Sequence, residues 1–302
     1  MHLDLDSVYA VALTVTLWIT ALGVGASHDP RSARAGVDRP GLVIRLLVLD
    51  VVVVPCIVLG LVRLVSVPDD LAVGLVIVGT ASAGPLGLKT AQLARGDVPL
   101  AITLVVGLEL LNIVAMPLWA AIALPSVVSV PLAEILRTLL VGVLVPLSIG
   151  FASRAWAPVL ARRVARWAPR LSTIALGLVI AVVLARDGAA VLAALGSGVP
   201  AVAVATILTA MVLGWWLGGP DPASRRTAAL VSSVRANVVA LAVASTAVGA
   251  AATATSAIVV FGLCSLLVVP PIAVLVGQRS ARFASGERHA SAADAPRTAP
   301  AG

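Results

Sequence analysis

The sequence predicts an all-α polytopic membrane protein with about nine transmembrane helices. Of its 302 residues, 60% are apolar and only 12% are charged, and the mean hydropathy is +1.08. Soluble domains, in contrast, carry about 25% charged residues. Apolar runs of about 20 residues, the length that crosses a bilayer as a helix, recur along the whole chain.

Nine apolar segments are the expected spans, and the arginines between them predict their orientation. The segments are 8–26, 41–66, 71–94, 98–123, 131–153, 170–186, 189–217, 226–249 and 253–277. Arginines gather in alternate loops, which the positive-inside rule places in the cytoplasm. We therefore expect a multi-pass plasma-membrane protein with its N-terminus outside and its C-terminus in the cytoplasm. The acidic start, with Asp4 and Asp6, lacks the basic opening of a signal peptide.

Two stretches between and after the spans are expected to differ from them. Segment 154–170 places several arginines opposite an apolar face, which is typical of a basic amphipathic helix on the cytoplasmic leaflet. An ordinary solvated loop is the alternative. The tail 279–302 is rich in Ala, Ser, Arg and Pro and is expected to be disordered. Cys56 and Cys264 lie inside apolar runs, so neither a disulfide nor a metal site is expected.

Four charged residues within the spans are candidate functional residues: Asp50, Lys89, Glu109 and Arg235. A charge at mid-bilayer costs roughly 2.5–3.5 kcal/mol on insertion scales, so such side chains usually face the interior of a helix bundle. Two are acidic and two are basic, and we expect them to neutralise one another. Two alternatives remain: Lys89 reaches the cytoplasmic surface along its aliphatic stem, or Glu109 makes a structural hydrogen bond near Asn112.

Two spans also carry helix-breaking or polar residues at membrane depth. The third is interrupted around Ser82 by Gly84, Pro85 and Gly87. Such breaks line cavities or contact protein, and in transporters they form the binding site; a simple proline kink is the alternative. The eighth holds a polar cluster, which indicates either interhelical hydrogen bonds or a site. Its members are Ser232, Ser233, Arg235 and Asn237.

The order of these features resembles the bile acid:sodium symporter superfamily between about residues 10 and 278. The run Leu93-Ala94-Arg95-Gly96-Asp97 is similar to the Leu-Ala-(Lys/Arg)-Gly-(Asp/Asn) ending of that superfamily's broken helix. Pro55 matches its Gln-x-x-x-x-Pro helix. Asn237 matches its crossing-helix segment, where the following Leu-Ala pair falls one position late.

The resemblance implies a core domain and a panel domain built from two inverted repeats with crossing broken helices. The first repeat, residues 1–125, would lack its leading helix, and residues 126–278 would form the second. The resemblance also implies sodium-coupled uptake of an organic anion by alternating access.

The superfamily's sodium ligands are largely missing from this chain. Its Ser-Asn pair falls on Gly87 and Leu88, its crossing-helix Glu on Ser232 and its earlier Gln on Asp50. Three further ligand positions have no side-chain oxygen; they are Ala101, Val105 and Ala236. We expect an Asp50–Arg235 pair, and less strongly a Glu109–Lys89 pair, where relatives bind sodium. Coupling would then be by a proton, through Asp50 or Glu109, or absent.

The leading functional expectation is a secondary active transporter of a small organic anion in a bacterium. The alternative is a membrane receptor or scaffold that kept the fold and lost transport. An enzyme is not expected, since the three histidines lie in termini or loops: His2, His28 and His289. We expect no cofactor, no metal and no nucleic acid; sodium is implied only by the resemblance. The lipid bilayer and the solute are the expected partners, and a homo-oligomer is left open.

Overall fold

The computed structural model describes residues 5–27, 38–123, 132–247 and 252–293, and the regular elements within them are all helical. Two of these elements, η2 and η3, are five-residue π-helical turns. In chain order the elements are α1 (Leu5–Ser27), α3 (Pro40–Val48), η2 (Leu49–Val53), α4 (Val54–Val65), α5 (Asp69–Thr80), α6 (Pro85–Leu93), α7 (Val98–Ala123), α8 (Leu132–Leu139), η3 (Leu140–Leu144), α9 (Val145–Trp156), α10 (Pro158–Leu195), α11 (Val199–Leu217), α12 (Pro222–Ser233), α13 (Asn237–Ala247) and α14 (Ala252–Ala293).

Among the described residues, seven helical stretches are long and apolar enough to cross a membrane, by length and composition. Two of them, Pro40–Val65 and Leu132–Trp156, run through a π-helical turn. The other two expected spans, 71–94 and 226–249, are not continuous: each is divided into two short helices, α5 with α6 and α12 with α13. The chain is therefore a polytopic helical membrane protein in which two segments are broken.

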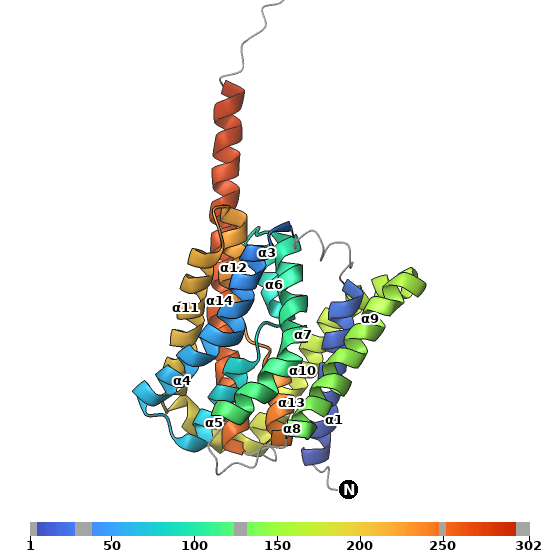
Figure 1. Ribbon diagram of the computed structural model, residues 1–302, viewed down its shortest axis with the longest axis vertical. Coiled ribbons are helices and arrows are strands. Elements are labelled where there is room, and N and C mark those ends of the chain that lie inside the picture. The colour runs from blue at the N-terminus through green and yellow to red at the C-terminus, as the bar shows by residue number, and fades with distance from the viewer. Residues whose placement is uncertain (1–4, 28–37, 124–131, 248–251, 294–302) are drawn as a thin grey trace, which may run out of the picture.

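The helices pack in two groups. In one, α1 lies against α9 and α10; in the other, α5 packs on α14, α11 on α12 and α14, and α6 on α12. Figure 1 shows α1 and α9 on one side of the molecule and α4, α11, α12 and α14 on the other. Glycine allows the closest contact in the first group, since a Cβ on Gly25 would overlap the backbone of α9 at Leu147 and Gly150.

Helix α10 differs from the expected pattern at both ends. It begins at Pro158, so most of segment 154–170 forms its first turns instead of a separate surface helix. Its backbone is non-helical at Asp187, beside the expected end of the sixth span at 186, so two helices meet there at a kink. The second of them runs to Leu195, and α11 starts at Val199 instead of the expected 189. The Ala-rich run after Asp187 favours this short helix, because alanine has high helix propensity.

The last helix also extends beyond its expected end. Disorder was expected from residue 279, but α14 runs to Ala293. Ala and Arg are frequent in this stretch, and both favour the helix. The rest of the expected disordered tail, 294–302, lies outside the described residues, as does the expected division between the last two spans at 248–251.

Candidate functional site

Asp50 lies in the π-helical turn η2, and Pro55 explains the geometry of this turn. The N–H of Val54 bonds the carbonyl of Leu49 five residues earlier, which is the π register. The next bond in that register would need an N–H at position 55, which proline lacks. The carbonyl oxygen of Asp50 is thus available, and it accepts a hydrogen bond from the Ser82 hydroxyl at 2.9 Å.

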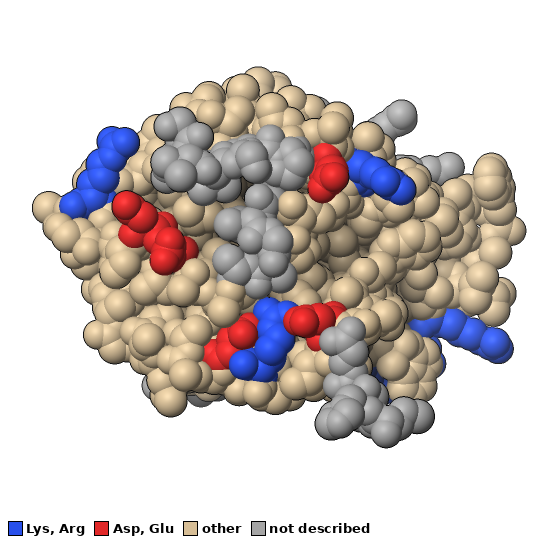
Figure 2. Space-filling view, turned by 90° about the horizontal axis from the view of Figure 1, so that it is seen from below, with Lys and Arg blue, Asp and Glu red and all other residues tan. Residues whose placement is uncertain are grey.

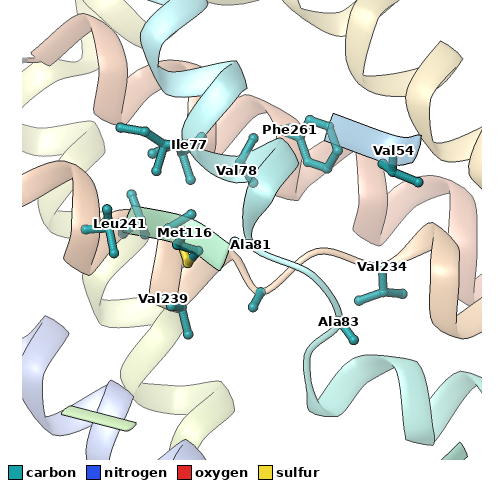
Figure 3. Packing of buried hydrophobic residues seen from close by; sticks show 14 of the residues in the cluster. Val54, Ile77, Val78, Ala81, Ala83, Met116, Val234, Val239, Leu241 and Phe261 are labelled. Carbon is teal, nitrogen blue, oxygen red and sulfur yellow. The ribbon is translucent and has the colours of Figure 1, made fainter. Parts of the chain in front are cut away.

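The two broken helices cross through their non-helical segments. The first break covers residues 81–84, where Gly84 is extended and Pro85 starts α6; the second covers 234–236. Ser82 and Arg235 form a single antiparallel bridge, in which the N–H of Ala236 donates to the carbonyl of Ala81 at 2.9 Å. Figure 3 shows the two segments passing each other beside Ala81, Ala83 and Val234, within the packed apolar core.

A fully buried ion pair lies at this crossing. Arg235 Nη2 is 2.5 Å from Asp50 Oδ1, and the two side chains are 1% and 0% exposed. The Ser232 hydroxyl donates to the other carboxylate oxygen of Asp50 at 2.7 Å, and Arg235 Nη2 also donates to the Ser232 carbonyl. The expected Asp50–Arg235 contact is therefore present. The second amino group of Arg235, Nη1, is buried without a hydrogen-bond partner in the described part of the chain.

Asn112 of α7 holds the first break in its extended form. Its Nδ2 donates to the Ser82 carbonyl at 2.8 Å, and its Oδ1 accepts from the Ser82 N–H at 3.2 Å. These two bonds replace the helical partners that residue 82 loses at the break. Asn112 is almost completely buried, so the breaks, the ion pair and α7 form one connected polar network.

The expected Glu109–Lys89 pair is wrong. Lys89 is exposed on α6, and Glu109 is buried in α7; the described residues contain no ion pair or hydrogen bond to the Glu109 carboxylate. Lys89 follows the surface alternative because α6 is a short helix and the lysine stem can extend beside it to water. The expected hydrogen bond between Glu109 and Asn112 is not formed either; both polar atoms of Asn112 bond Ser82 instead.

Three other predicted residues lie beside the network without joining the ion pair. The Ser233 hydroxyl donates to the Leu230 carbonyl of its own helix. The Asn237 side chain packs against Gly262 of α14, and its Oδ1 is buried without a partner among the described residues. Gly87 lies inside α6, where its Cα faces Val231 of α12, so it belongs to a helix contact and not to the break.

A second polar cluster joins the ends of the broken helices, and the sequence reasoning gave it no role. Asp97 caps α7 by accepting from the N–H of Leu100 at 3.0 Å. It also accepts from the Ser224 hydroxyl at 3.2 Å, while its carbonyl accepts from Thr227. A Cβ on Gly96 would overlap the Thr227 hydroxyl. The sequence feature that marks this cluster is the Arg-Gly-Asp ending of the motif Leu93 to Asp97. It could be recognised as a motif, but its role in joining α12 to the start of α7 depends on contacts that the sequence does not show.

Sodium does not fit the crossing as it stands. A hard cation needs several free oxygens, but one carboxylate oxygen of Asp50 is bonded to Arg235 and the other to Ser232. The guanidinium already places a positive charge beside that carboxylate. Two of the other positions expected to carry ligands, Ala101 and Val105, are buried apolar residues of α7.

Comparison with known proteins identifies a family. A family model described as the Sodium Bile acid symporter family matches residues 14–194, which is more than half of the 302-residue chain. No curated protein matches the sequence.

Proposed function

This chain belongs to the Sodium Bile acid symporter family, and we propose that it is a secondary transporter whose Arg235 replaces a sodium ion. The observation that supports the proposal is the buried Asp50–Arg235 pair at the crossing of the two broken helices. A tethered guanidinium gives the carboxylate the countercharge that a bound cation would otherwise give. Transport would then not require sodium.

The proposed substrate is a small organic anion. Arg235 Nη1 supports this class, because a buried guanidinium nitrogen without an acceptor is a donor that an anionic solute can use when the crossing opens. The location beside two helix breaks supports it as well, since unwound segments at membrane depth are where transporters bind solutes.

The proposed architecture consists of two inverted repeats, 1–125 and 126–278, in the plasma membrane. The two breaks, one in each proposed repeat, support this division, as does the antiparallel bridge that joins them. The N-terminus would lie outside and the C-terminus in the cytoplasm, because Arg95, Arg225 and Arg226 lie near the ends of helices on the side predicted to face inward. Alternating access would move one helix group against the other.

Glu109 is the proposed proton carrier, if transport is coupled to an ion at all. Asp50 already has a cation and a hydroxyl as partners. Glu109 is 5% exposed and has no such partner within the described residues. An ionised carboxylate in that position would lack a countercharge, which is costly in a membrane, and a proton removes the charge.

The experiment is solute uptake into proteoliposomes with sodium, potassium or choline outside. We expect equal uptake in the three salts, and uptake that scales with sodium would contradict the proposal. The matched variant Arg235→Ala sharpens the test, because it leaves the oxygens of Asp50 and Ser232 facing the vacated space. Sodium, but not choline, should then raise the thermal stability of this variant in detergent.

The second candidate is a receptor or scaffold without transport. The hydrogen bonds at the crossing favour this candidate, because the carboxylate of Asp50 and the backbone of Ser82 already have partners within the protein. The two functions differ in solute-dependent flux. Binding of an organic anion without any flux into proteoliposomes, in any of the three salts, would support the receptor and exclude the transporter.

A further inference from the structure

A second candidate site lies between α11, α12 and α14. A surface cavity of about 280 Å³ is lined there by side chains of the three helices, among them Val212, Trp216, Arg226 and Ile272. Its wall is almost entirely apolar, and Arg226 is its charged member. The volume is at the lower end of the range for small-molecule pockets, about 300–1,000 Å³, which suits a narrow, flexible, apolar chain.

The cavity lies on the outer surface of the helix bundle. Val212 is 53% exposed and Trp216 is 77% exposed, and both line the cavity. Figure 1 shows α11 along one edge of the molecule. In a polytopic membrane protein such exposed apolar side chains face lipid, and tryptophan is enriched where the hydrocarbon meets the headgroups. The cavity is thus open to the lipid.

Arginines gather at one end of this cavity. Arg226 is near the start of α12, and its Nε is buried with no hydrogen-bond partner in the described residues; its Nη2 donates to the Arg95 carbonyl. Arg225 lies over the ring of Trp215, near the end of α11. Arg279 is exposed and follows the cavity residue Val276 by three positions on α14, which places both on one face.

The opposite end of the cavity is apolar. Met211 and Val212 precede the tryptophans on α11, Ala229 and Leu230 follow Arg226 on α12, and Ile272 precedes Val276 on α14. On all three helices, the residues farther from the arginines are apolar. An amphiphile with an anionic head and a hydrocarbon chain matches this gradient.

We propose that this cavity binds one acyl chain of an anionic phospholipid, with its phosphate at Arg226, Arg225 and Arg279. The unpartnered Nε of Arg226 is a donor for a phosphate oxygen. Basic residues at a membrane surface attract anionic lipids, by about 1 kcal/mol per residue, which is about five-fold in affinity. The site holds the lipid as a bound component, so it goes beyond transport and does not depend on it.

The test measures lipid binding to the purified full-length protein by native mass spectrometry. Phosphatidylglycerol and phosphatidylcholine with identical acyl chains are compared, and we expect phosphatidylglycerol to bind roughly a hundred-fold more tightly, from about five-fold for each of the three arginines. Arg226→Gln, which keeps a donor for the Arg95 carbonyl, should lower this preference about five-fold. Val276→Phe should fill the cavity and weaken both lipids. Arg162→Gln, on an exposed arginine of α10 that does not line the cavity, should change neither.

Three outcomes would overturn the proposal. Equal binding of the two lipids by the wild-type protein excludes the arginine site without the need for any variant. An equal loss in Arg162→Gln and Arg226→Gln indicates attraction by surface charge alone. Competition by glycerol phosphate as effective as that of the intact lipid excludes a role for the acyl chain. None of these measurements involves flux, so they are independent of the proposed transport.

Discussion

Two ion pairs in this protein join residues that are far apart in the sequence, yet their surroundings are opposite. At the crossing, Arg235 contacts Asp50, and both side chains are buried. At one end of the molecule, Arg186 bonds Asp6 and Asp187 at 2.7 Å each and lies over the ring of Tyr9. There the Asp6 side chain is 75% exposed. Figure 2 shows charged side chains of both signs spread around an end face that is otherwise uncharged.

The difference shows that the number of bonds in an ion pair is a poor guide to its importance. Water can replace Asp6 as a partner of Arg186, whereas nothing replaces Asp50 at the crossing. A buried pair is costly to form, but it is far more costly to leave half formed. We therefore expect substitutions at the two pairs to differ in size, in salt dependence and in whether a second substitution repairs the first.

The largest effect is expected for Arg235→Ala. Asp50 would keep its charge without a cation, and the free energy of unfolding should fall by about 3–5 kcal/mol. The measurement is thermal or denaturant unfolding of the purified protein in detergent. Asp50→Asn should be similarly severe, because it leaves Arg235 unpaired.

The double variant Asp50→Asn/Arg235→Gln is the control for this pair. It removes both charges, and it should recover much of the lost stability, since neutral replacements of a buried pair are often tolerated. Additive losses of stability in the double variant would show that the two side chains act independently. They would contradict the conclusion that the buried pair differs from the exposed one.

The next effect is expected for Asn112→Ala, which leaves the Ser82 carbonyl buried without a partner, while the Ser82 N–H keeps its bond to the Thr80 carbonyl. The cost should be about 1–3 kcal/mol per unsatisfied group. Asn237→Ala is the matched control, because the Oδ1 of Asn237 has no partner to lose among the described residues. The same unfolding assay compares the two, and equal losses would contradict the role of Asn112 in holding the break.

A smaller effect is expected for Asp6→Asn at the exposed pair. Surface ion pairs contribute about 0–1 kcal/mol, and added salt should reduce even that difference. Asp187→Asn should cost more, because the Asp187 side chain is only 12% exposed. Unfolding at low and high salt measures both. A loss at Asp6 as large as that at Asp50 would show that burial does not decide the outcome.

The smallest effect is a pH dependence at Asp221, the N-cap of α12. The bond from the Ser224 N–H holds the pKa of the Asp221 carboxyl below its usual range. Its contribution is therefore complete above the ordinary aspartate pKa of about 3.9 and is lost as the pH falls through the folded-state pKa. Wild type should exceed Asp221→Asn in free energy of unfolding by about 0.3–1 kcal/mol at pH 7, and the difference should vanish once the pH lies below the folded-state pKa of Asp221. The exposed Asp38→Asn is the control.

The need of a charge inside an apolar span for a countercharge predicted that the buried charges would pair, and the family resemblance indicated Asp50 with Arg235. Asp50 and Arg235 had no route to water, whereas Lys89 had one, and that freedom explains the wrong pairing with Glu109. The break before Pro85 was also predictable, since glycine and proline at membrane depth mark it, whereas the break before Asn237 was expected only from the family resemblance. The family membership was visible in Leu93 to Asp97.

The remaining features depend on tertiary contacts that no local pattern contains. The bonds from Asn112 to Ser82 need α7 to lie beside the break, and the bond from Ser82 to Asp50 needs the π turn that Pro55 produces. The boundary expected at 186 coincides with the kink of α10 at Asp187, but the short helix from there to Leu195 was assigned to the next span because its residues are apolar.

The bond from the Ala236 N–H to the Ala81 carbonyl joins the two breaks through the main chain alone. Substitution of the side chains around it leaves its donor and acceptor in place. A lineage can therefore exchange the chemistry of the crossing, an ion for an arginine, without first losing the geometry. In evolutionary terms the backbone is the fixed frame, and the charge within it is the part free to drift.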